Sequence, residues 1–104
     1  MKEIIEKLNN LKITQESIEF LEDLPEDIYE KYFESTTIVE NVLDVEKHRW
    51  YETSISVYKL PEGFLGVRSI TDVVGENNSV EDMFHRLKFF EMEPIQTTTY
   101  IIKK

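Results

Sequence analysis

The stretch from His48 to Leu60 constrains the fold most, because its residues change character with a period of two. Tyr51, Thr53, Ile55 and Val57 alternate with Trp50, Glu52, Ser54 and Ser56. This period indicates a half-buried strand, since successive side chains of a strand point to opposite faces. The sequence Leu60-Pro61-Glu62-Gly63 favours a turn. Residues 64–70 then form the returning strand, so we expect an antiparallel hairpin over residues 49–70.

Three short helices are expected before the hairpin. Residues 2–11 place Ile4, Leu8 and Leu11 at helical spacing, which predicts the first helix. Thr14 is a suitable N-cap for a second helix over residues 15–24. Pro25 ends that helix, because its ring would clash with the carbonyl four residues earlier, and it suits the first position of a third helix that runs to about Glu34.

The remaining segments complete an α+β pattern in a single domain, residues 1–104. Residues 36–47 fit either a helical stripe or a strand, and their β-branched residues favour the strand. Residues 80–90 carry an apolar helical face after Ser79, which resembles a capping-box residue with Asp82 three positions later, so we expect a further helix there. Phe89, Phe90 and Met92 fit this helix less well, and the alternative is a change to extended structure before Pro94. Residues 95–102 are rich in Thr and Ile, which predicts a terminal strand.

Composition limits the partners that such a domain can bind. The chain of 104 residues carries 21 acidic and 12 basic residues, a net charge of -9. Affinity for DNA or RNA comes mainly from Lys and Arg side chains that neutralise phosphates, so we do not expect this acidic chain to bind nucleic acid directly. We expect a basic protein as its partner instead. The chain has no Cys, which excludes disulfide scaffolds and thiol catalysis, and no apolar run of membrane-spanning length. We therefore expect a cytoplasmic protein that has no membrane partner.

Residues 13–30 carry most of the charge imbalance, with seven carboxylates and no Lys, Arg or His. These carboxylates, the first candidate binding residues, are Glu16, Glu19, Glu22, Asp23, Glu26, Asp27 and Glu30. If residues 15–24 are helical, Glu16, Glu19 and Asp23 share one face and could resemble the phosphate spacing of a nucleic-acid strand. The alternative is a solvated helix face, because acids near a helix start interact favourably with its dipole. A purely solubilising helix usually mixes charges of both signs, which this stretch does not.

No motif in the chain indicates catalysis, a cofactor or a metal site. His48 and His85 lack the spacing of a metal-binding pair, and the glycines at positions 63 and 66 lack the Lys of a phosphate loop. We therefore expect a protein that is not an enzyme and binds no cofactor or metal. Trp50 and Tyr51 form a second candidate binding surface, because aromatic residues are enriched at interface hot spots, although core packing also explains them.

A resemblance covers about half of the chain, from His48 onward. It is carried by Arg49-Trp50-Tyr51, Val57-Tyr58-Lys59-Leu60, Gly63-Phe64-Leu65-Gly66-Val67 and the tail from Phe90 to Tyr100. These segments resemble small acidic proteins of phages and other mobile elements in low-GC Gram-positive bacteria. Some proteins of such loci are anti-CRISPRs, which bind a Cas effector and block its nucleic-acid groove or catalytic domain.

The resemblance and the acidic stretch together imply a phage-type inhibitor. It would bind a basic nucleic-acid-binding host defence protein, such as a Cas nuclease, through its acidic surface and block nucleic-acid binding or cleavage. The alternative is a phage structural or assembly component, or a homodimer whose hairpin surface pairs with itself.

Overall fold

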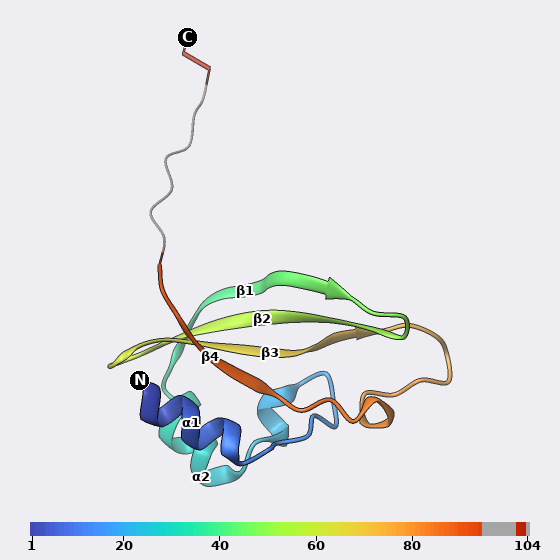
Figure 1. Cartoon of the computed structure of the whole chain (residues 1–104), viewed down its shortest axis with the longest axis horizontal. Helices are drawn as coiled ribbons and strands as arrows, with labels where there is room; N and C mark the ends of the chain where they lie inside the picture. The colour runs from blue at the N-terminus through green and yellow to red at the C-terminus, as the bar shows by residue number, and fades with distance from the viewer. Residues whose placement is uncertain (95–101, 104) are drawn as a thin grey trace.

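The computed structural model describes residues 1–94 and 102–103, without the side chains at positions 40 and 41. It has an α+β fold, as predicted, in which helices and loops cover one face of an antiparallel sheet (Figure 1). Four strands lie in the sheet in chain order: β1 (Thr37–Lys47), β2 (Tyr51–Leu60), β3 (Gly63–Val73) and β4 (Lys88–Met92). The predicted hairpin is confirmed as β2 and β3, and the ambiguous segment 36–47 forms β1.

The helical elements are short. They are α1 (Lys2–Asn10), the 3-10 helix η1 (Phe20–Asp23), α2 (Glu26–Ile28), the π-helix η2 (Tyr29–Phe33) and the 3-10 helix η3 (Glu81–Met83). Helix α1 confirms the first predicted helix, while α2 and η2 together confirm the third. No helix among the described residues is long and apolar enough to cross a membrane.

The predicted second helix over residues 15–24 is wrong. Thr14 is not an N-cap but pairs with Arg86 in an isolated antiparallel bridge. Asp23 then folds the following loop, because its carboxylate accepts hydrogen bonds from the backbone N–H groups of Glu16 (2.9 Å) and Ser17 (3.1 Å). Asp side chains often offer the backbone such an alternative to helical hydrogen bonds. Only η1, a single turn, remains of the expected helix.

The predicted helix over residues 80–90 is also wrong. Its first turn is the 3-10 helix η3, which ends at Phe84 in the left-handed region with φ of 51°. The chain then extends, and β4 pairs with β3 from Arg68 opposite Lys88 to Phe64 opposite Met92. Pairing with β3 gives the backbone N–H and C=O groups of β4 hydrogen-bond partners. This gain outweighs the preference for a helix that the spacing of the apolar residues indicates. The predicted terminal strand, residues 95–102, lies almost entirely outside the described residues.

The core lies between the sheet and the helices that cover it. Its centre is Tyr58 of β2, whose ring meets Phe33 edge-to-face at 5.2 Å between centroids and Phe20 at 6.4 Å. Leu65 and Val67 of β3 are fully buried beside it. The other members of this buried cluster are Leu8, Ile13, Leu24, Ile28, Tyr32, Leu60, Leu87 and Phe89.

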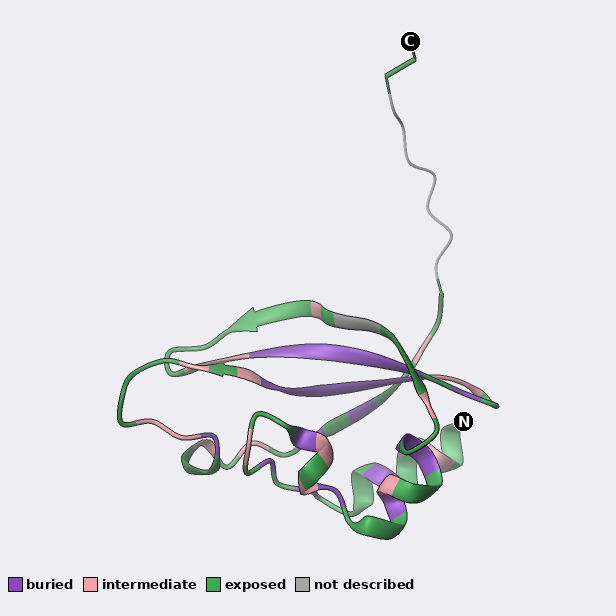
Figure 2. Ribbon diagram, turned by 180° about the vertical axis from the view of Figure 1, so that it is seen from behind, coloured by how far each residue is buried: buried purple, intermediate pink, exposed green. Residues whose placement is uncertain are grey.

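Strand β2 is buried on both faces, so the prediction of a half-buried strand is wrong for residues 53–58 (Figure 2). The face turned away from the helices is covered in part by Met92, which lies over Gly66. A Cβ atom at Gly66 would lie 2.6 Å from the Met92 Sδ, so any larger residue there would displace this methionine.

Arg68 holds β1 against the rest of the sheet. Its guanidinium is almost fully buried and donates hydrogen bonds to the Asp44 carbonyl (3.1 Å) and Thr53 Oγ1 (3.2 Å). It also forms ion pairs with the Asp44 carboxylate and, at 3.6 Å, with Glu46. Since Arg68 lies on β3 and these carboxylates on β1, the cation links the two strands across β2.

The sheet has one edge closed by side chains. Asn9 exchanges two hydrogen bonds of 3.0 Å with the backbone N–H and carbonyl of Phe89 on β4. Gln15, which is completely buried, does the same for Ile70 on β3 at 2.6 and 3.0 Å. At the other edge, β1 pairs with β2 alone among the described residues.

Candidate functional site

Among the seven carboxylates of residues 13–30, Glu16, Glu19 and Asp23 do not share the predicted helical face, because residues 15–24 do not form a helix. Asp23 is turned inward to bind the backbone of the loop and is therefore a structural residue. The other six are exposed, and none of them forms an ion pair with any described residue. Those that lie along η1, α2 and η2, here called the acidic ridge, are Glu19, Glu22, Glu26, Asp27 and Glu30. Glu16 lies apart from this ridge, in the loop before η1.

A shallow hollow lies within the acidic ridge. It has a volume of about 470 Å³, and three ridge carboxylates surround an apolar floor. The lining residues are Glu19, Leu21, Glu22, Leu24, Glu26 and Tyr29. Carboxylates around an apolar floor match a Lys or Arg side chain, which has an apolar stem and a cationic end.

The structure separates Trp50 and Tyr51 from the acidic ridge. Both lie near the turn between β1 and β2, at the opposite end of the sheet from α2 (Figure 1). Trp50 is 48% exposed, and the Arg49 guanidinium lies 4.7 Å from the centre of its ring. Tyr51 stacks on His48, with 4.6 Å between the ring centroids.

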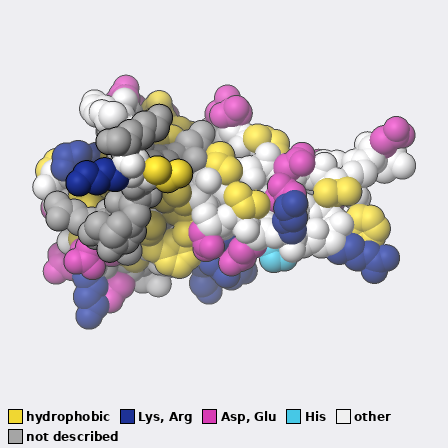
Figure 3. Space-filling view, turned by 90° about the horizontal axis from the view of Figure 1, so that it is seen from above, with side chains coloured by type: hydrophobic (Ala, Val, Ile, Leu, Met, Phe, Trp, Pro, Cys, Tyr) yellow, Lys and Arg dark blue, Asp and Glu magenta, His cyan; other side chains and the backbone are white. Residues whose placement is uncertain are grey.

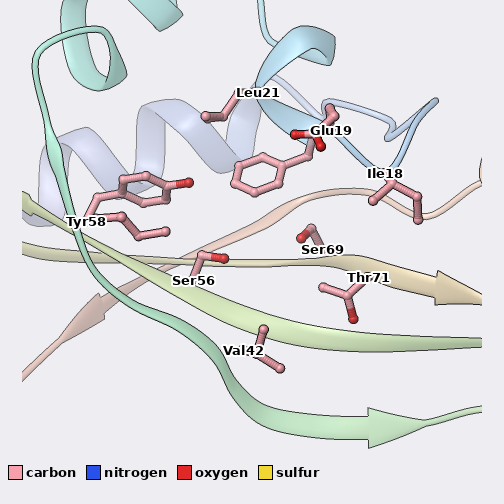
Figure 4. A pocket seen from close by; sticks show the side chains of 10 residues that line it. Ile18, Glu19, Leu21, Val42, Ser56, Tyr58, Ser69 and Thr71 are labelled. Carbon is pink, nitrogen blue, oxygen red and sulfur yellow. The ribbon is translucent and has the colours of Figure 1, made fainter.

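A second pocket, which the sequence did not predict, lies between the loop before η1 and the sheet (Figure 4). Its volume is about 410 Å³, within the usual range for ligand sites. We call it the serine pocket. It is lined by Ile18, Glu19, Phe20, Leu21, Ile38, Val42, Ser56, Tyr58, Ser69 and Thr71.

The serine pocket exists because small residues replace large ones on the helix-facing side of the sheet. Ser54 and Ser69 are directly paired across β2 and β3, and Ser56 is paired with Val67. Farther along the same face, Tyr58 and Leu65 fill the space beneath the helices. Serines at successive inward positions of a strand, visible in the sequence, were the one signal that could have indicated this hollow.

Tyr58 and Glu19 mark the polar end of the serine pocket. Burial, and secondarily the negative charge of Glu19, raise the pKa of the Tyr58 phenol to about 12. The phenol therefore remains protonated and can donate or accept a hydrogen bond there. Glu19 lines both the serine pocket and the acidic hollow, so it lies between the two.

The exposed side of β1 is unusually apolar for an edge strand. Ile38, Val39, Val42 and Val45 are between 45 and 53% exposed. The face seen from above the sheet carries separate hydrophobic side chains along its length (Figure 3). The strand is also irregular, with three register shifts against β2 and positive φ angles at Val42 and Asp44. Such bulges bend an edge strand and restrict its pairing with other chains.

His48 and His85 are the two histidines of the chain. No group of three or more His, Asp or Glu side chains suited to a metal occurs in the described part of the chain. Burial lowers the pKa of His85, and the nearby cations Lys88, His48 and Arg68 lower it further, while a hydrogen bond to the Arg68 backbone opposes the change. The His85 Nε2 atom is buried without a hydrogen-bond partner among the described residues.

The lowered pKa of His85 predicts a pH dependence of stability. Because the unfolded state binds the proton more readily, His85 makes the protein less stable as the pH falls below about 6.5. His85→Gln should reduce the loss of unfolding free energy between pH 7.5 and 5, by a slope of at most about 1.4 kcal/mol per pH unit. Urea denaturation of both proteins across this range measures the effect, and equal slopes would contradict it.

Comparison with known proteins finds no relative of this chain. No family model, curated protein or solved structure matches the chain.

Proposed function

We propose that this chain is a non-catalytic binding protein that engages a basic nucleic-acid-binding protein through the acidic ridge. The observation that carries the proposal is a set of exposed carboxylates without an ion-pair partner among the described residues, three of which surround an apolar hollow. A role in solubility alone explains neither the apolar hollow between the carboxylates nor the lack of basic residues in this segment.

The hollow explains how one basic side chain would be held. The stem of a Lys or Arg packs on Leu21, Leu24 and Tyr29, while its charged end meets the ridge carboxylates. The remaining carboxylates of the ridge attract a basic surface over a longer range and increase the rate of association. This attraction is screened by salt, so the binding is expected to be sensitive to ionic strength.

The resemblance of residues 48–104 to small phage proteins favours a CRISPR-Cas effector as the partner in this proposal. A CRISPR-Cas effector holds its nucleic acids in a positively charged channel. Carboxylates that occupy part of this channel compete with phosphates for the same Lys and Arg side chains. The protein would then block nucleic-acid binding or cleavage without a chemical step of its own.

Reversing the charge of the ridge tests this function. The variant Glu22→Lys, Glu26→Lys, Asp27→Lys and Glu30→Lys should lose binding to guide-loaded Cas nucleases by at least about a hundredfold, because attraction becomes repulsion. Asp23 is left unchanged because it holds the loop. Titration at low and high salt, with a DNA cleavage assay, measures binding and inhibition across a panel of such nucleases.

A matched control changes the net charge equally at exposed positions outside the ridge. It carries Glu3→Lys, Glu6→Lys, Glu76→Lys and Glu81→Lys. This control should keep most of its binding at moderate salt. Equal binding by the ridge variant and the wild type, or failure of the wild type to bind every nuclease in the panel, would contradict the proposal.

A second candidate function is self-association in a phage structural or assembly role. The edge of β1, which pairs only with β2 among the described residues and carries exposed valines, favours it, while side chains close the opposite edge of the sheet. Two copies could pair their β1 edges and bury these valines, in the manner of strand addition. The register shifts in β1 oppose long continuous pairing, which makes this the weaker of the two candidates.

Sedimentation velocity over a concentration series tests self-association. If β1 pairs with its copy, the wild type should form dimers and Val39→Lys with Val45→Lys should remain monomeric, because lysines at an edge oppose pairing. The control pair Leu11→Lys and Val74→Lys replaces equally exposed apolar residues outside β1 and should still dimerise. A wild type that is monomeric at millimolar concentration would exclude this function.

A further inference from the structure

We propose that the serine pocket receives one arginine side chain from an extended segment of the basic partner. This inference rests on the proposed function and deepens it, because it assigns a specific recognition site beside the acidic ridge. Its support comes from the two chemically different walls of the pocket, from its single charged group and from its place at the open edge of the sheet.

The polar wall of the serine pocket is formed by side-chain hydroxyl groups. Ser56 and Ser69 are almost completely buried, and together with Tyr58 they turn their hydroxyl groups toward the hollow, which Thr71 also lines (Figure 4). Hydroxyl oxygens accept hydrogen bonds from a cation as readily as they donate to other groups. A guanidinium has five N–H donors in a planar fork, so it can use several such acceptors at once.

The charge of the pocket selects the sign of the ligand. Glu19 is the one charged residue that lines it. A carboxylate repels an anion and pairs with a guanidinium through two parallel hydrogen bonds. Burial and, to a lesser degree, this carboxylate raise the pKa of Tyr58 to about 12, so the phenol stays protonated.

The apolar wall suits the stem of an arginine. Ile18 comes from the loop before η1 and Phe20 from η1 itself, while Ile38 and Val42 come from β1. The three methylene groups of arginine can pack on these side chains while the guanidinium meets the polar wall. A free inorganic cation would leave this apolar surface without a contact.

The position of the pocket indicates a segment of a protein as the source of the arginine. Ile38 and Val42 belong to β1, which pairs with β2 alone among the described residues. An extended segment that lies along β1 can form backbone hydrogen bonds with it and direct one side chain over the edge into the pocket. Strand addition with a side-chain pocket is a known mode of peptide recognition.

Peptide titration followed by NMR tests the inference on the isolated chain. The probes are acetyl-Thr-Val-Arg-Val-Thr-amide, the same peptide with citrulline in place of arginine, and n-propylguanidinium. Citrulline keeps the shape of arginine without its charge. We expect saturable shifts at Ser56, Ser69 and Thr71, a dissociation constant on the order of 1 mM for the arginine peptide, and binding at least about tenfold weaker for the citrulline peptide.

Two variants sharpen the test. Glu19→Gln should remove the preference for arginine over citrulline, because it removes the charge at nearly constant shape. Ser69→Ala should weaken binding of the arginine peptide about threefold through the loss of one hydroxyl acceptor. The ridge variant, which keeps Glu19, should still bind the peptide in the serine pocket. The proposal for the acidic ridge and the proposal for the serine pocket can therefore fail independently of each other.

Three outcomes would overturn the inference. They are shifts confined to the acidic hollow around Tyr29, equal affinity for the arginine and citrulline peptides, and a preference for arginine that survives in Glu19→Gln. The first two use the wild type and do not depend on whether a variant folds. Equal affinity for n-propylguanidinium and the arginine peptide would overturn the assignment of the ligand to a partner segment.

Discussion

The hydrogen bonds between Gln15 and the backbone of Ile70 are the constraint on which the rest of the structure depends. Strand β4 begins opposite Arg68, so it does not pair with Ile70 farther along β3, whose backbone N–H and carbonyl would otherwise be buried without partners. The buried amide of Gln15 supplies both a donor and an acceptor, and Asn9 repeats this arrangement at Phe89. Leaving such groups unpaired costs about 1–3 kcal/mol each, so these two side chains close the sheet at this edge.

Gln15 also fixes the route of the acidic segment. Its backbone N–H donates to the carbonyl of His85, and Leu87 donates to the carbonyl of Ile13, so residues 13–15 cannot begin a helix. The loop that follows places Ile18, Glu19 and Phe20 above the serines of β2 and β3. The serine pocket and the acidic ridge are therefore both consequences of one strand-like contact at the closed edge.

Elements fixed by local pattern could be predicted from the sequence, and elements fixed by distant pairing could not. The hairpin and α1 follow from periodicity, and α2 with η2 follows from Pro25. The helices expected over residues 15–24 and 80–90 failed, because Thr14 and Arg86 pair with each other across the chain. Charge alone identifies the acidic segment in the sequence. That Asp23 binds the loop backbone and is not part of the acidic ridge follows only from the fold of the loop. The serine pocket was missed because serines in a strand usually signify a polar face.

Backbone hydrogen exchange measured residue by residue tests most directly the claim that side chains close one edge and leave the other open. The amides of Ile70 and Phe89 should be strongly protected, whereas β1 amides that point away from β2 should exchange near the unprotected rate. Gln15→Met keeps the side-chain volume but removes the amide. In this variant the backbone amide of Ile70 should exchange rapidly, while that of Phe89 should stay protected. Rapid exchange of Ile70 in the wild type, or protection along the whole of β1, would contradict this account.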